Sequence, residues 1–188
     1  MVKDLLGLIA EGLYSPRLSA RKILDGNHGM DAVVLMVALS YLVQAILAII
    51  ITGRAASEED HLFFGHLLAA VVHIGLFLLI VMLAFGIGKV LGGRGTRQQA
   101  FQVIGWHTLV TTLLAPVFLL AQTQMTPDGA PGIVIAVFLM AGGVWLWVLA
   151  NFVAELHGFQ SVWSTLAGVF AVAMLMAGLM TALFQTPG

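Results

Sequence analysis

Histidines inside apolar segments are the first residues of this sequence that could do chemistry. His66 and His73 lie seven residues apart, which is nearly two helical turns, so both fall on one face of a helix. His107 lies about ten residues into the next apolar segment, beside Trp106. Ionisable side chains are costly inside a membrane, and residues of this kind are therefore candidates for function.

Two interpretations of His73 and His107 follow, because adjacent antiparallel helices would bring the two rings within reach of each other. The first is a proton relay or a two-histidine metal site. The second is a pair of neutral imidazoles that hydrogen-bond across helices, while Thr108, Thr111 and Thr112 bond to their own backbone. A metal site needs three or four ligands, and we expect no carboxylate at that depth. We therefore favour the structural interpretation and predict no catalytic residue, no metal ligand and no cofactor.

A second polar group is predicted near one end of the fourth apolar segment. Asn151 and Glu155 are four residues apart and share a helix face. Gln102 lies one turn into the third segment and could join them. The structural interpretation is a salt bridge from Glu155 to one of three nearby basic residues, Lys89, Arg94 or Arg97. The functional alternative is a polar vestibule that receives a lipid headgroup or a side chain of a partner.

The stretch KVLGGRGTRQQAF, Lys89 to Phe101, contains glycines and basic residues that could cradle a phosphate. A phosphate-binding P-loop, however, needs GxxxxGK[ST] between a strand and a helix. Here the glycines follow an apolar helix and the lysine precedes them. We therefore expect Gly92, Gly93 and Gly95 to end one helix and turn the chain, with Thr96 capping the next helix.

The elements that position these residues are membrane helices. Hydrophobic residues make up 60% of the 188 residues, charged residues 9%, and the mean hydropathy is +1.02. A soluble domain carries about 25% charged residues, so this chain could not cover its own surface in water. The absence of cysteine excludes disulfides, thiolate zinc sites and iron–sulfur clusters. The first 26 residues show no cleavable signal peptide.

Five segments are long enough to cross a hydrocarbon core of about 30 Å. They are Ala32–Thr52, His66–Leu91, Gln98–Gln122, Gly132–Ala154 and Gln160–Phe184. The predicted fold is an all-α, polytopic bundle of five transmembrane helices, residues 31–188, preceded by an amphipathic helical segment, residues 1–30. Pro116 should kink the third span. Glycines should allow close helix approach, namely Gly75, Gly86, Gly88, Gly142, Gly143, Gly168 and Gly178.

The distribution of Lys and Arg predicts the orientation, because cytoplasmic loops of membrane proteins are enriched in both. Seven of the eight basic residues fall on one side of the predicted spans: Lys3, Arg17, Arg21, Lys22, Lys89, Arg94 and Arg97. The N-terminus should then be cytoplasmic and the C-terminus periplasmic or extracellular. Six of these residues, all but Lys3, are candidates to contact lipid headgroups or a partner. We expect the N-terminal segment to be an interfacial anchor or, alternatively, a docking surface for a cytosolic partner.

Four short motifs, taken together, resemble the Yip family of five-span membrane proteins in its bacterial branch. The motifs are SPR with the following Ala and Ile (Ser15 to Ile23), GGxGT with the following AF (Gly92 to Phe101), Pro116 in mid-helix, and LHG with the following Trp (Leu156 to Trp163). The resemblance implies an inner-membrane protein. Eukaryotic members bind Rab-type GTPases through long cytosolic N-terminal regions. This chain has only about 30 residues before its first span, so that role is not carried over.

The function predicted from the sequence is a non-enzymatic scaffold or adaptor that organises the membrane. The alternative is a small transporter or channel for ions, protons or metals that uses His73 and His107. An enzyme is not expected, because GxSxG, HExxH and paired aspartates are absent. The expected partners are membrane lipids, a second copy of the chain and an unidentified membrane or cytosolic protein. Nucleic acid is not expected.

Overall fold

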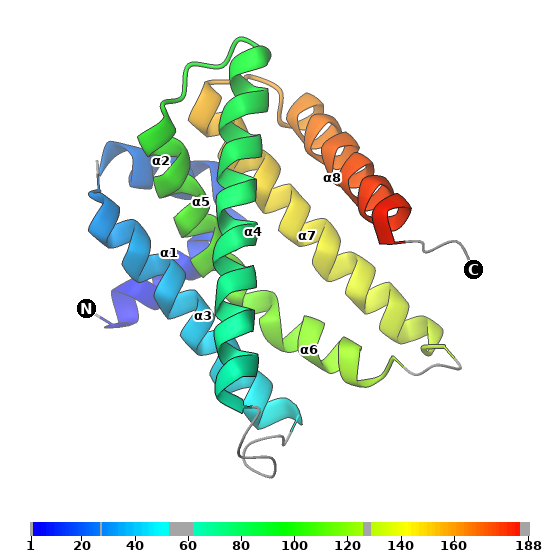
Figure 1. Ribbon diagram of the computed structural model, residues 1–188. Coiled ribbons are helices and arrows are strands. Elements are labelled where there is room, and N and C mark those ends of the chain that lie inside the picture. The colour runs from blue at the N-terminus through cyan, green and yellow to red at the C-terminus, as the bar shows by residue number, and fades with distance from the viewer. Residues whose placement is uncertain (1, 27, 53–61, 126–128, 185–188) are drawn as a thin grey trace.

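The computed structural model describes the chain except for residues 1, 27, 53–61, 126–128 and 185–188. The fold is all-α (Figure 1). An N-terminal pair of short helices, α1 (Val2–Tyr14) and α2 (Pro16–Asp25), precedes the long helices α3 (Met30–Thr52) and α4 (Leu62–Val90). The chain continues through α5 (Arg97–Thr111), a 3₁₀ turn (Thr112–Leu114), α6 (Ala115–Thr123), α7 (Gly132–His157) and α8 (Val162–Phe184).

Four segments of the described chain are long and apolar enough to cross a membrane. They are Met30–Ile51, Leu67–Val90, Arg97–Thr123 and Gly132–His157, and each matches one of the predicted spans within a few residues. The protein is therefore an integral membrane protein. The fifth predicted span falls on α8, whose described apolar stretch, Val162–Leu175, is shorter than the other four. Its crossing of the membrane remains a prediction.

The third span is interrupted in its middle, where a kink was predicted from Pro116. The α-helix ends at Thr111, a 3₁₀ turn follows, and α6 begins at Ala115 with the proline in its first turn. Proline lacks an N–H, and its ring clashes with the carbonyl four residues earlier, which is that of Thr112. The hydroxyls of Thr111 and Thr112 bond back to the carbonyls of His107 and Thr108.

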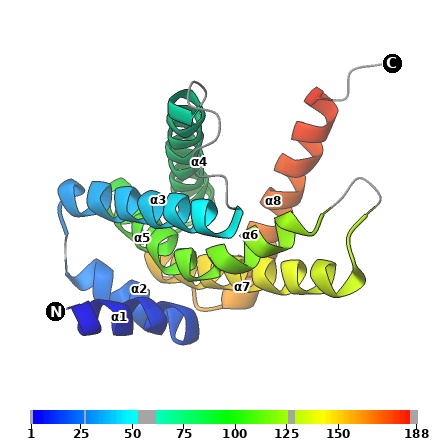
Figure 2. The same ribbon diagram turned by 90° about the horizontal axis from the view of Figure 1, so that it is seen from below.

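Helix α5 lies at the centre of the bundle. In an apolar 18-residue stretch of the segment formed by α5 and α6, 56% of the residues are buried, against 11% to 22% in the corresponding stretches of the other three segments. Figure 2 shows α1 and α2 on one side of α5 and α7, with α3 and α4 on the other side. Two apolar clusters fill these layers, one between α3, α4, α5 and α7 and one between α1, α2, α5 and α7.

The N-terminal pair packs on the bundle, which the sequence did not predict. Ile9 and Ala20 are buried against α5 and α7, and Gly12 of α1 lies against the side chain of Val110. Leu5 and Leu6, near the start of α1, are exposed. The predicted role of the N-terminal segment as an interfacial anchor remains a prediction.

Of the seven glycines predicted to allow close helix approach, only one lies against another helix of the described chain. Gly88 of α4 lies directly against the ring of His157. A Cβ added at any of the other six positions would have no atom of the described residues within 4 Å: Gly75, Gly86, Gly142, Gly143, Gly168 and Gly178. Within the described part of the chain, the prediction is therefore wrong for these six.

Candidate functional site

Three of the short motifs found in the sequence meet at one end of the bundle. Ser15–Arg17 covers the start of α2, and the loop from Gly92 to Thr96 joins α4 to α5. Residues 155–159 cover the end of α7 and the first residues after it. We call this meeting point the motif corner. We call the end of the bundle on which it lies the basic end, because the described basic residues gather there.

Glu155 is the charged centre of the motif corner. Its Oε2 accepts a hydrogen bond from Arg17 Nε at 2.9 Å, and its Oε1 accepts one from Arg21 Nε at 2.7 Å. The side chain of Glu155 is 13% exposed and that of Arg21 is 60% exposed, so Arg17 is the more enclosed of the two partners at 35%. The bond to Glu155 raises the pKa of Arg21. The carboxylate stays charged because two guanidinium groups replace the water that it loses.

Arg17 also ties α2 to the loop after α7. Its guanidinium donates to the carbonyl of Gln160 at 3.2 Å and to the carbonyl of Phe159. The predicted salt bridge from Glu155 to Lys89, Arg94 or Arg97 is therefore wrong. Because α2 folds back onto the end of α7, two arginines of α2 reach the carboxylate instead.

His157 joins the end of α7 to the loop from Gly92 to Thr96, which we call the glycine loop. Its ring fills the space above Gly88 and Gly93, where a Cβ at either position would overlap ring atoms. Its Nε2 lies 3.0 Å from the carbonyl oxygen of Ala84, to which a protonated Nε2 donates, and its ring stacks on Phe159. His157 was not predicted as a site residue, although it lies in the motif LHG.

The glycine loop has the predicted turn chemistry. Gly92 has φ of +83°, which favours glycine, and the N–H of Arg94 donates to the His157 carbonyl at 3.2 Å. Thr96 caps α5: its Oγ1 accepts from the Gln99 N–H, and the Gln99 side chain accepts from the Thr96 N–H. The predicted cap is confirmed, and the loop is held by hydrogen bonds of this chain.

Basic side chains surround the motif corner. Lys22 pairs with Glu11 at 2.7 Å. Lys89, Arg94 and Arg97 are exposed, and no carboxylate among the described side chains pairs with them. Their contact with lipid headgroups or a partner remains a prediction. Three cations on one surface give the basic end an excess positive charge.

The two predicted amide partners of Glu155 bind elsewhere. Gln102 is almost fully buried and donates to the carbonyl of His28, which ties α5 to the segment before α3. Asn151 donates to the carbonyl of Trp147, one turn earlier in α7, at 2.8 Å. Both side chains satisfy backbone carbonyls, and neither bonds to Glu155 in the structure.

The structure gives the intramembrane histidines different neighbours. His107 is 1% exposed, lies against the rings of Trp145 and Phe152, and has its Nε2 3.4 Å from the Trp145 carbonyl. His73 lies 5.5 Å from the ring of Tyr41, and its Nε2 is buried without a hydrogen-bond partner. His66 belongs to α4, but its side chain lies outside the described part. No group of three or more metal-ligating side chains occurs among the described residues.

Comparison with known proteins gives one match. A family model described as Yip1 domain matches residues 12–183, which is nearly the whole chain and includes all three motifs of the corner. No curated protein and no solved structure matches the chain.

Proposed function

Because the chain belongs to the Yip1 domain family, we propose that it is a non-enzymatic scaffold or adaptor that organises a bacterial inner membrane. The proposal rests on one observation, namely what the polar side chains at and near the motif corner bind. Glu155, Arg17, His157 and Gln102 bind one another or backbone carbonyls, and thereby hold α2, α4, α5 and α7 together. Polar groups that are bound in this way stabilise a platform.

The proposed topology places the basic end in the cytoplasm. Lys89, Arg94 and Arg97 lie at that end together with α2, as the enrichment of Lys and Arg in cytoplasmic loops requires. Helix α8 starts there, contacts α7 and runs back toward the other end of the bundle (Figure 1), although it diverges from α7 along its length (Figure 2). At 23 residues it is about 34 Å long at 1.5 Å per residue, enough for a core of about 30 Å. We infer five spans, with the C-terminus outside.

Self-association is the third part of the proposal. Gly75 of α4 and Gly143 of α7 are exposed, and no atom of the described residues lies within 4 Å of a Cβ built on them. In lipid, small residues let helix backbones approach closely, so such open positions suit a second copy. A scaffold that forms homo-oligomers could gather lipids or proteins around itself without doing chemistry.

Single cysteines can test self-association directly, because the chain contains none of its own. We expect Gly75→Cys or Gly143→Cys to form disulfide-linked dimers in native membranes. Leu35→Cys, at a 68% exposed position of α3, is the control for random collision. Dimer yields at both glycine positions that do not exceed the yield at Leu35 would contradict self-association through these faces.

The alternative, a small transporter or channel, has weaker support. It needs a polar path, and the two histidines that were its candidates have different neighbours, with His107 enclosed by aromatic rings. The purified protein in proteoliposomes decides between the two functions. The scaffold account expects no uptake of protons, common ions or divalent metals above that of empty vesicles. Uptake that His107→Phe abolishes would instead establish the transporter.

A further inference from the structure

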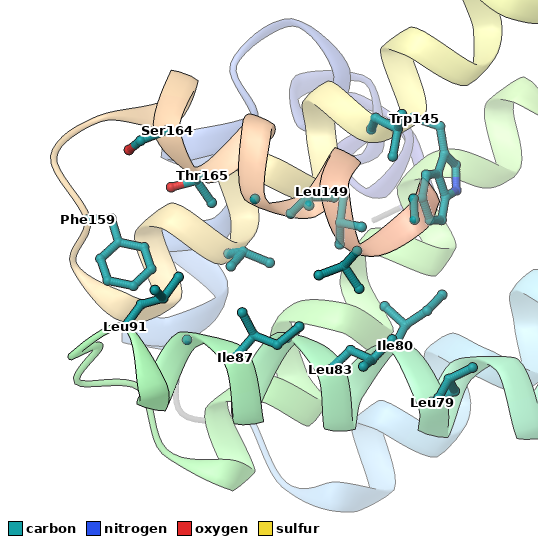
Figure 3. Close-up of a pocket in the computed structure, with 18 residues that line it drawn as sticks. Leu79, Ile80, Leu83, Ile87, Leu91, Trp145, Leu149, Phe159, Ser164 and Thr165 are labelled. Carbon is teal, nitrogen blue, oxygen red and sulfur yellow. The ribbon is translucent and has the colours of Figure 1, made fainter. Parts of the chain in front are cut away.

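An apolar groove opens between α4 and α8, with α7 as its floor (Figure 3). Its volume is about 630 Å³. Leu79, Leu83 and Ile87 line the α4 side, and Leu149 lies on the floor. The α8 side is lined by Ser164, Thr165, Gly168, Val169, Val172 and Ala173. With α8 as the proposed fifth span, the groove lies within the membrane and is filled by lipid or by another helix.

The groove has the length of one leaflet. On α8 its lining runs from Ser164 to Ala173 and on α4 from Leu79 to Leu91. At 1.5 Å per residue these stretches are about 14 and 18 Å long. Half of a hydrocarbon core of about 30 Å is about 15 Å. The groove therefore begins at the basic end and stops near the middle of the membrane.

The length of the groove favours an acyl chain over a helix. A spanning helix has an apolar length of about 30 Å, about twice the length of the lining. One acyl chain, in contrast, extends from the headgroup level to the middle of the hydrocarbon core, which is the extent of the lining.

The excess positive charge of the basic end, beside the groove, favours an anionic headgroup. Phe159 lines the groove at the basic end, and its carbonyl accepts from Arg17 of the motif corner. The side chains described at this end include six basic residues, Arg17, Arg21, Lys22, Lys89, Arg94 and Arg97, against four acidic ones, Glu11, Asp25, Asp31 and Glu155. The excess positive charge is complementary to an anionic headgroup held at that level.

We propose that this groove binds an anionic glycerophospholipid of the leaflet at the basic end. One acyl chain lies between α4 and α8, and the headgroup lies at the level of Phe159 and Ser164. The hydroxyls of Ser164 and Thr165 donate to the Ser161 carbonyl, and their oxygens can still accept a hydrogen bond. The inference rests on the proposed position of α8 as the fifth span, and it does not depend on the scaffold role.

Native mass spectrometry of the purified protein with added phosphatidylglycerol tests the proposal. Gly168→Leu places a side chain in the groove, where no atom lies within 4 Å of a Cβ at this position. We expect it to weaken binding at least about tenfold, since the displaced acyl segment loses its apolar contacts. Gly142→Leu is the matched control, because its Cβ site is equally open and lies outside the groove.

Further measurements keep the test decisive. Ala173→Phe fills the groove at its inner end and should act like Gly168→Leu if that variant does not fold. With the wild-type protein, phosphatidylglycerol should bind more tightly than phosphatidylcholine of the same chains, and shortening the chains should weaken binding. The proposal is overturned if both groove variants bind as the wild type does, if chain length and headgroup have no effect, or if Gly168→Leu instead dissociates a dimer.

Discussion

At the scale of single residues, packing at the motif corner depends on the absence of side chains at two glycines. The His157 ring lies against Gly88 and Gly93 and, through its Nε2, against the carbonyl of Ala84. A ring can close the gap between α4, α7 and the glycine loop only if both glycines leave room for it. The glycines at positions 88 and 93 are thus explained by His157, which follows Gly93 by 64 residues in the chain.

Gly93→Ala should destabilise the protein by about 1–3 kcal/mol, because the added methyl group overlaps the His157 ring and approaches the Gly88 carbonyl to 2.6 Å. Thermal unfolding in detergent measures the change. Gly142→Ala is the control: its site is open, and alanine in a helix is favoured over glycine by about 0.5–1 kcal/mol. A Gly93→Ala protein as stable as the wild type would contradict the described packing of His157.

The sequence predicted the interactions of single residues best where the partners are close in the chain. The Thr96 cap and the turn at Gly92 depend on neighbours within a few positions, and both were predicted correctly. The partners of Glu155 were predicted wrongly, because Arg17 is 138 positions away and no local pattern shows where α2 lies. His157 was missed for the same reason, since the glycines that it contacts lie on another helix.

At the scale of elements, α1 is held on α5 by the close contact of Gly12 with Val110. The side chains of Leu5, Leu6 and Leu8 of α1 remain exposed. Hydrophobic periodicity alone therefore suggested a free interfacial helix, because it does not say which apolar residues face protein and which face lipid. The break of the third span is the opposite case, since a proline dictates it locally.

Gly12→Leu should detach α1 and loosen α2, because its side chain cannot fit beside Val110. Trypsin can report this, since Arg17, Arg21 and Lys22 of α2 are potential cleavage sites. We expect faster cleavage within α2 in Gly12→Leu than in the wild type. Gly7→Leu, at a position with no atom within 4 Å, should leave the rate unchanged. Equal rates in all three proteins would contradict the docking of α1.

At the scale of the whole molecule, the predicted spans are the part that the sequence determines most directly. Apolar length identifies a membrane helix without any knowledge of its neighbours, and four predicted spans match helices of the structure. The arrangement of these helices was not predictable in the same way. Helices that are apolar on all sides carry no signal for which face packs on which neighbour, and so the central place of α5 emerged only from the structure.

The central claim is that the basic end, with the motif corner, faces the cytoplasm of a five-span membrane protein. An impermeant thiol reagent on intact cells tests it with single cysteines at Gln98, Gln124 and a position added after Gly188. Gln98 and Gln124 are exposed and lie at opposite ends of the third span. The account predicts labelling of Gln124→Cys and of the added cysteine, and labelling of Gln98→Cys only after permeabilisation. Labelling of Gln98→Cys in intact cells, or protection of the added cysteine, would contradict it.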